Sequence, residues 1–295
     1  HYNAGFHQTA TSGSFGSTIV ASKLLGLSED QTINALGLVS TRASGIKSQF
    51  GTMGKPFHAG MAASNGIEAA KLSKLGFISR DDGIECEQGF FQTHGWNKEI
   101  PPRAIEGLGV EFLFPEIKYK FHACCHGLHS FLEALDELKQ VNNFNPETIE
   151  KIEIETNPSW LKVCNIEKPK TGLESKFSYK LTAAMSIFGK DTSSLDTYDD
   201  TICFNDQMNE IRDKVKVIPN ENLTNTQSVI SIKDGSSEIN NKHDLSDNIE
   251  KNILETKIVS KSASLLSKAK SEQIEKILNE PKVNQVSTLV GCMVS

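Results

Sequence analysis

Two loops concentrate the side chains that could do chemistry. The first spans residues 54–60, GKPFHAG, and places Lys55 just before a proline and His58 in the first turn of an expected helix. The unpaired amides at a helix start and a lysine ammonium both attract an anion. The segment therefore predicts a site for a carboxylate or a phosphate. The alternative is that Lys55 is an ordinary surface lysine and that His58 is a buried histidine whose hydrogen bonds the protein satisfies.

The second loop spans residues 118–129, KYKFHACCHGLH, and precedes another expected helix. Lys120 and the imidazoles of this loop could bind an acid. Sulfur and imidazole also ligate zinc, but no second cluster completes a ligand set, and the adjacent Cys124 and Cys125 point in different directions. No cysteine–histidine–asparagine order supports a thiol nucleophile, and no glycine-rich phosphate loop is present. We therefore expect neither a metal nor a nucleotide cofactor.

A third segment, residues 1–15, places His7 directly ahead of a run of small residues that begins a helix. A histidine-bearing loop of this kind is rarely a free terminus, and the sequence has no initiator methionine, so we expect a carboxy-terminal piece of a longer enzyme. Seven of the eight histidines lie within the first 129 residues. This asymmetry favours a site built from that half.

The composition indicates a globular protein and excludes some partners. A net charge of −6 and a pI near 5.8 argue against nucleic-acid binding, which needs a basic patch. The longest apolar runs are far shorter than the roughly 20 residues that cross a bilayer. Six scattered cysteines favour a reducing compartment. We therefore expect a cytoplasmic protein without a nucleic-acid or membrane partner.

The hydrophobic pattern predicts helical hairpins over the first hundred residues, with Ser28 and Gln31 as a capping box. A mixed segment follows, with strands at 149–156 and 229–233 and a helix at 129–141, and helices return after residue 247. We expect a mainly α fold, a large all-helical domain interrupted by a smaller α+β lid domain. In this division the helical domain comprises 1–115 and 248–295, and the lid comprises 116–247.

Four blocks, GFHQTA, GKPFHAGMAA, KFHACCHGLH and KFSYKLTAAM, resemble segments of the MmgE/PrpD family and occur in the same order. The family includes 2-methylcitrate dehydratase, cis-aconitate decarboxylase and iminodisuccinate epimerase. The resemblance covers essentially the whole chain. Because family members are longer, it also implies that about the first third of the protein, all helical and bearing site residues, is missing here.

The resemblance implies that the catalytic residues His7, Lys55, Lys120 and Tyr179 face one pocket. His7 is the expected base, Tyr179 the hydrogen-bond donor or acid, and the two lysines the carboxylate anchors. Further substrate-binding candidates are His58, Cys125 and His129. Two prolines usual in the family after the lysine of the second loop are absent, which leaves the pose of Lys120 open. Cis-aconitate decarboxylases carry histidine at the position of Cys125, which argues against decarboxylation, although His126 could compensate.

The resemblance thus implies a cofactor-independent lyase that eliminates water from a small hydroxy di- or tricarboxylate such as 2-methylcitrate. Lysine ammonium groups suit the charge that grows on a carboxylate when its neighbouring carbon loses a proton, and an imidazole suits proton transfer at neutral pH. We expect a homodimer. A decarboxylase or an epimerase stays an alternative, because all three reactions pass through a carbanion or enolate. An inactive piece without its upstream residues is the other alternative.

Overall fold

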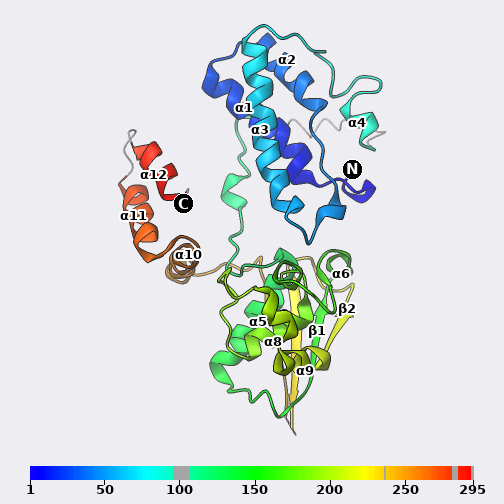
Figure 1. Cartoon of the computed structure of the whole chain (residues 1–295), viewed down its shortest axis with the longest axis vertical. Helices are drawn as coiled ribbons and strands as arrows, with labels where there is room; N and C mark the ends of the chain where they lie inside the picture. The colour runs from blue at the N-terminus through cyan, green and yellow to red at the C-terminus, as the bar shows by residue number, and fades with distance from the viewer. Residues whose placement is uncertain (96–105, 236, 281–284, 294–295) are drawn as a thin grey trace. The chain divides into compact units, whose positions relative to one another are not determined.

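The computed structural model describes residues 1–95, 106–235, 237–280 and 285–293. The chain divides into two compact units, His1–Pro115 and Glu116–Ser295 (Figure 1). Within the described residues, no helix combines the length and the apolar character needed to cross a membrane.

The long helices of the described part of the first unit are α1 (Gln8–Leu25), α2 (Glu29–Ser40) and α3 (Gly54–Lys74). The expected capping box is confirmed, since Ser28 Oγ accepts from the Gln31 amide while the Gln31 side chain accepts from the Ser28 amide. Small residues let α1 and α3 approach closely: a Cβ on Gly66 would lie 2.1 Å from Ser17 Oγ. The Ser17 hydroxyl donates to Ala62 O across this contact. The short elements are η1 (Tyr2–Ala4), η2 (Lys47–Gln49) and α4 (Phe90–Thr93).

The second unit is built on a four-stranded sheet with the order β2-β1-β3-β4. Its strands are β1 (Ile149–Thr156), β2 (Val215–Pro219), β3 (Gln227–Asp234) and β4 (Ser237–Asp244). β1 pairs parallel to β2 and antiparallel to β3, with Ile152 opposite both Val215 and Ile232. The two predicted strands are confirmed as β1 and as part of β3. The short β2 adds a parallel edge to a sheet that is otherwise antiparallel.

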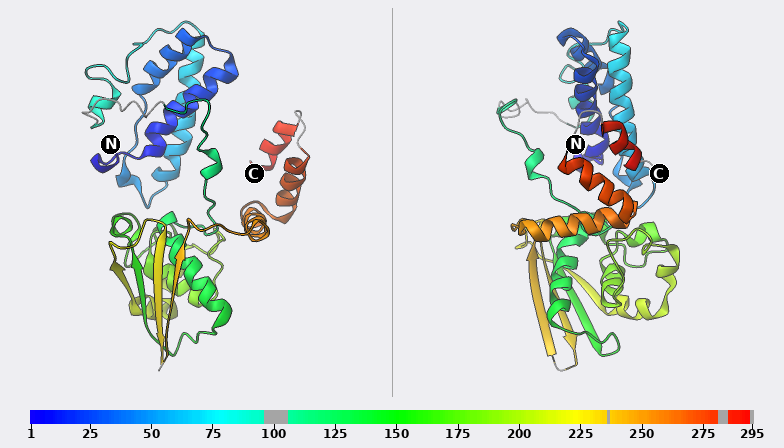
Figure 2. Two further views of the ribbon diagram at one scale, coloured as in Figure 1. Left: turned by 180° about the vertical axis from the view of Figure 1, so that it is seen from behind. Right: turned by 90° about the vertical axis from the view of Figure 1, so that its left-hand side faces the viewer.

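Helices α5 (His129–Val141), α8 (Tyr179–Ile187) and α9 (Asp206–Lys214) cover one face of this sheet (Figure 2). Their apolar side chains meet the inward-facing isoleucines of β1 and β3 in one core, which contains Phe131, Leu132 and Leu135 of α5. The short helices described between residues 114 and 204 are η4 (Phe114–Glu116), η5 (His126–Leu128), α6 (Pro158–Cys164), α7 (Gly172–Ser175) and η6 (Asp200–Phe204).

The last helices correct the expected fold class. α10 (Lys251–Leu266), α11 (Lys268–Asn279) and α12 (Val286–Met293) group with the sheet-bearing unit. One reason is electrostatic, because Lys257 of α10 forms an ion pair with the buried Glu133 of α5. A large all-helical domain interrupted by a smaller α+β lid is therefore wrong. The helical unit is the shorter of the two, and the α+β unit continues to the last helices.

Candidate active-site clusters

A pair of buried histidines forms the chemical centre of the first unit. His7 lies at the N-cap of α1, where its backbone N–H donates to Gly45 O at 2.9 Å, and His58 comes from the second turn of α3. Their Nδ1 atoms lie 2.9 Å apart. A hydrogen bond between two Nδ1 atoms needs one proton between them, so one imidazole donates and the other accepts. Each ring keeps its Nε2 for other partners.

Gly45 is required for this pairing, and sequence reasoning missed it. A Cβ at this position would lie 2.4 Å from Ala10 Cβ and 3.2 Å from the Cδ2 of His58. Only a glycine therefore lets the loop before η2 close over the two rings. No local pattern in the sequence distinguishes this glycine from an ordinary turn glycine.

Lys55 and Phe50 complete the cluster in the first unit. The Phe50 ring packs edge-on against His7, with 4.9 Å between centroids, and the Lys55 ammonium lies 5.9 Å from the centroid of the same ring. Burial lowers the pKa of His7, and the charges of His58 and Lys55 lower it further. His7 is therefore neutral at pH 7 and able to accept a proton. The structure thus brings together His7, His58 and Lys55.

The predicted residues of the second unit gather around the loop that leads into α5. The backbone N–H of Ala123 donates to Thr192 O at 2.8 Å, and that of Cys125 donates to Lys176 O at 2.9 Å. Lys120 is exposed on this loop. Burial lowers the pKa of His126, and the charge of Lys120 adds to the effect. Lys120 therefore lies within electrostatic reach of the imidazoles that follow it.

His129 is almost fully buried at the start of α5. Burial lowers its pKa to about 2, with His122, Lys120 and His126 adding to the shift. Its Nε2 has no hydrogen-bond partner within the described residues. The imidazole is thus neutral at pH 7, and its Nε2 is a buried polar atom without a hydrogen bond to any described residue.

Cys125 and Tyr179 belong to the interior of the second unit. Both side chains are buried, and Tyr179 is fully so. The Tyr179 hydroxyl donates to Gly127 O at 2.7 Å and lies 3.1 Å from Thr156 Oγ1, while burial raises its pKa well above the usual value. Through the Tyr179 hydroxyl of α8, these contacts connect Gly127 of the loop with Thr156 of β1. The acid role expected for Tyr179 stays untested, and the geometry gives it a positioning role.

Two family models match this chain. The model of the MmgE/PrpD N-terminal domain matches residues 1–102, and that of the MmgE/PrpD C-terminal domain matches residues 122–281, more than half of the chain. The chain belongs to the MmgE/PrpD family. The resemblance drawn from the four sequence blocks is thereby confirmed.

Several cis-aconitate decarboxylases and a decarboxylase-like protein are similar to this chain. A cis-aconitate decarboxylase-like protein of Aspergillus oryzae is 33% identical over 46% of this chain and 30% of its own length. A cis-aconitate decarboxylase of Aspergillus terreus is 27% identical over 68% of this chain and 44% of its own length. The human cis-aconitate decarboxylase is 39% identical over 29% of this chain and 18% of its own length. The matched part of this chain thus spans less than half of each relative.

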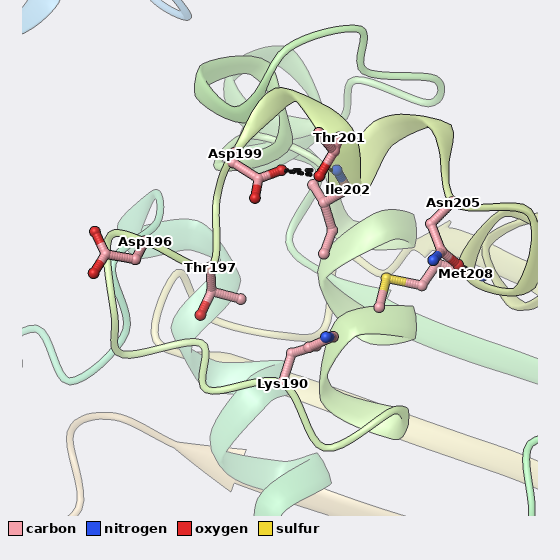
Figure 3. A pocket seen from close by; sticks show the side chains of 8 residues that line it. All are labelled: Lys190, Asp196, Thr197, Asp199, Thr201, Ile202, Asn205 and Met208. Carbon is pink, nitrogen blue, oxygen red and sulfur yellow. Dashed lines mark hydrogen bonds between the residues drawn. The ribbon is translucent and has the colours of Figure 1, made fainter.

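Two further features of this MmgE/PrpD chain lie apart from the predicted residues. A pocket of about 320 Å³ in the second unit is bordered by Lys190, Asp196, Asp199 and Met208, among others (Figure 3). None of the predicted site residues lines it. Over the described part of the chain, no group of three or more histidine, cysteine or acidic side chains is arranged to hold a metal ion.

A buried carboxylate beside the second cluster makes stability depend on pH. Burial alone would raise the pKa of Glu133, but His122 and Lys257 beside it lower the pKa from 4.5 to about 2. Because the folded pKa is lowered, the charge stabilises the fold above the unfolded pKa, and that stabilisation disappears as the pH falls toward the folded pKa. Urea titrations should show the protein losing roughly 2 kcal/mol between about pH 5 and pH 3 through this group.

The matched control is Glu133→Gln, which keeps the shape and removes the titration. This variant should be less stable at neutral pH, because Lys257 and His122 lose their acidic partner. Its stability should then decline less steeply than that of the wild type between the same two pH values. Equal slopes for the two proteins would show that Glu133 does not titrate as described.

Proposed function

We propose that this protein is a cofactor-independent lyase that decarboxylates a small tricarboxylate, with cis-aconitate as the preferred candidate. The observation that carries the proposal is the buried, hydrogen-bonded pair His7–His58 beside Lys55, which supplies proton transfer next to a cation. The names of the curated relatives favour decarboxylation over the dehydration expected from the sequence. We therefore place 2-methylcitrate second.

The chemistry explains why these residue types suit the task. When a carboxylate leaves cis-aconitate as carbon dioxide, its bonding electrons form a new double bond, and the old double bond shifts its electrons to the carbon beside another carboxylate. That carbon must then take up one proton. An ammonium such as that of Lys55 stabilises the charge that grows on the adjacent carboxylate, and an imidazole nitrogen can deliver the proton.

The histidine pair can acquire that proton when the substrate binds. In the free protein the pKa of His7 is lowered by burial and by two neighbouring groups, so His7 is neutral at pH 7. A bound polycarboxylate brings negative charge, which raises the pKa of a nearby imidazole. While it is neutral, the ring that donates its Nδ1–H to the other has an unprotonated Nε2, and a proton placed on that Nε2 converts this ring to an imidazolium that keeps its hydrogen bond to the other imidazole.

Dehydration of a hydroxy tricarboxylate such as 2-methylcitrate is the second candidate. Two observations favour it: Cys125 stands where the resemblance places a histidine in decarboxylases, and the neutral His7 is ready to act as a base. In that reaction His7 would remove a proton from the carbon beside a carboxylate while the hydroxyl leaves from the next carbon.

A screen of three substrates separates the candidates. We expect carbon dioxide release from cis-aconitate, and no comparable formation of double-bond absorbance from 2-methylcitrate or citrate. Absorbance from 2-methylcitrate without carbon dioxide release would make dehydration the function. Each assay should include a longer version with the upstream region typical of the family, because activity of that version alone would identify this chain as an inactive piece.

A further inference from the structure

Three lysines from separate segments of the second unit surround the loop before α5. Lys120 lies on the loop itself, Lys176 follows α7, and Lys261 belongs to α10. The backbone ties the second lysine to the loop, since Lys176 O accepts from the Cys125 amide at 2.9 Å. A second backbone hydrogen bond connects the segment at residues 192 and 193 to the loop, because Thr192 O accepts from the Ala123 amide at 2.8 Å.

The side chain of Lys261 contacts the segment at residues 192 and 193. Its ammonium donates to Ser193 O, the carbonyl next to the one that holds Ala123. The Lys176 ammonium lies 5.5 Å from the centroid of the Tyr198 ring, and the Tyr198 hydroxyl donates back to Thr192 O at 3.0 Å. Residues 192 and 193 thus connect both half-buried lysines to the loop that carries Lys120.

Within the described residues, the positive charge gathered here is not balanced by ion pairs. None of the three lysines forms an ion pair with a carboxylate in the residues that the structure describes, whereas Lys257, one turn earlier on α10, pairs with Glu133. Burial lowers the pKa of Lys176. Burial also lowers the pKa of Lys261, and the charges of Lys120 and Lys176 lower it further. Like charges held together in partly desolvated positions favour a bound anion.

Two neighbouring acidic groups, Cys124 and Asp191, do not balance the charge of the three lysines. Burial raises the pKa of the Cys124 thiol to about 12, so it is neutral at pH 7. Asp191 lies close enough to favour the charged form of Lys261, but its carboxylate accepts from the Ser193 amide and hydroxyl at 2.9 and 2.6 Å. One carboxylate engaged in a turn leaves most of the charge of three lysines unbalanced.

We propose that Lys120, Lys176 and Lys261 form an anion subsite that binds a carboxylate group of a polycarboxylate. Lys176 and Lys261 are the new members of this site. The identity of the ligand rests on the proposed function, while the existence of an anion site rests on the lysines alone. α10 therefore has a binding role in addition to its packing role.

Calorimetric titration with citrate, in the absence of turnover, tests the subsite. A charge-assisted contact to a carboxylate commonly accounts for about ten- to a hundredfold in affinity. Lys176→Met and Lys261→Met should each weaken citrate binding by about that factor, and Lys261→Arg should retain most of it. Lys268→Met is the matched control, because Lys268 is exposed on α11 and pairs only with Glu272. It should bind citrate like the wild type.

The outcomes separate this inference from the proposed function. Unchanged citrate affinity in Lys176→Met and Lys261→Met, at an unchanged melting temperature, would overturn the subsite even if cis-aconitate were decarboxylated. Lost affinity in both variants would support the subsite even if no substrate were turned over. Inorganic phosphate binding as tightly as citrate would overturn the assignment to a carboxylate, and no citrate binding to the wild type would overturn the site itself.

Discussion

Replacing His7 with asparagine should lower kcat/KM for cis-aconitate by roughly a hundred- to ten-thousandfold, the range typical of a lost general acid or base. Asparagine places an amide atom near the position of Nδ1, so the variant keeps a partner for His58 and loses the Nε2 position. The melting temperature should therefore change little. Steady-state kinetics and a thermal melt measure both quantities on one preparation.

Two further variants make the His7 result specific. His7→Gln places its amide near the Nε2 position, and because an amide cannot transfer a proton it should lose as much activity as His7→Asn if His7 carries the proton. His243→Asn is the matched control, because His243 of β4 pairs with Glu137 of α5 and takes no part in either cluster. Wild-type kinetics for His7→Asn would remove His7 from the reaction.

Gly127→Ala should unfold the second loop at a large cost in stability. A Cβ on Gly127 would lie 2.5 Å from the Trp160 ring and 2.8 Å from Cys164 Sγ, and the Gly127 carbonyl is held by Tyr179. Overpacking of this kind commonly costs about 1–3 kcal/mol. Because the residue lies between His126 and His129, citrate binding should weaken as well. Denaturant unfolding and calorimetry measure the two effects.

Gly16→Ala is the control for the substitution itself. Gly16 lies within α1, and a Cβ there meets no atom within 4 Å. Alanine should therefore stabilise that helix by about 0.5–1 kcal/mol through its better helix propensity. A stability of Gly127→Ala equal to that of the wild type would show that the loop moves away from Trp160 without cost.

Much of the helical structure could be predicted from local sequence. The α5 helix and the β1 strand follow directly from their hydrophobic periodicity, and the capping box before α2 follows from Ser28 and Gln31. The affiliation of α10 could not be predicted this way. It depends on Lys257 reaching a buried carboxylate on α5, a pairing over more than a hundred residues that no local pattern encodes. The polar β4 likewise lacks a strand signal of its own.

The same distinction applies to the candidate site. His7, His58 and Lys55 could be proposed from their motifs, because histidine and lysine at helix starts suit anion chemistry. Gly45 and the lysines at 176 and 261 could not be, because their roles depend on neighbours distant in sequence. The hydrogen bond from Tyr179 to Gly127 O likewise joins distant segments and could not be predicted, while the expected acid role of Tyr179 stays a prediction.

The most direct test of the proposed reaction combines two readings of one incubation. Cis-aconitate labelled with carbon-13 in its carboxyl groups would be mixed with the protein in heavy water and followed by NMR and mass spectrometry. The account predicts one labelled carbon dioxide and one deuterium in the product for each substrate consumed, with both signals lost in His7→Asn. Consumption of cis-aconitate without carbon dioxide release would contradict it.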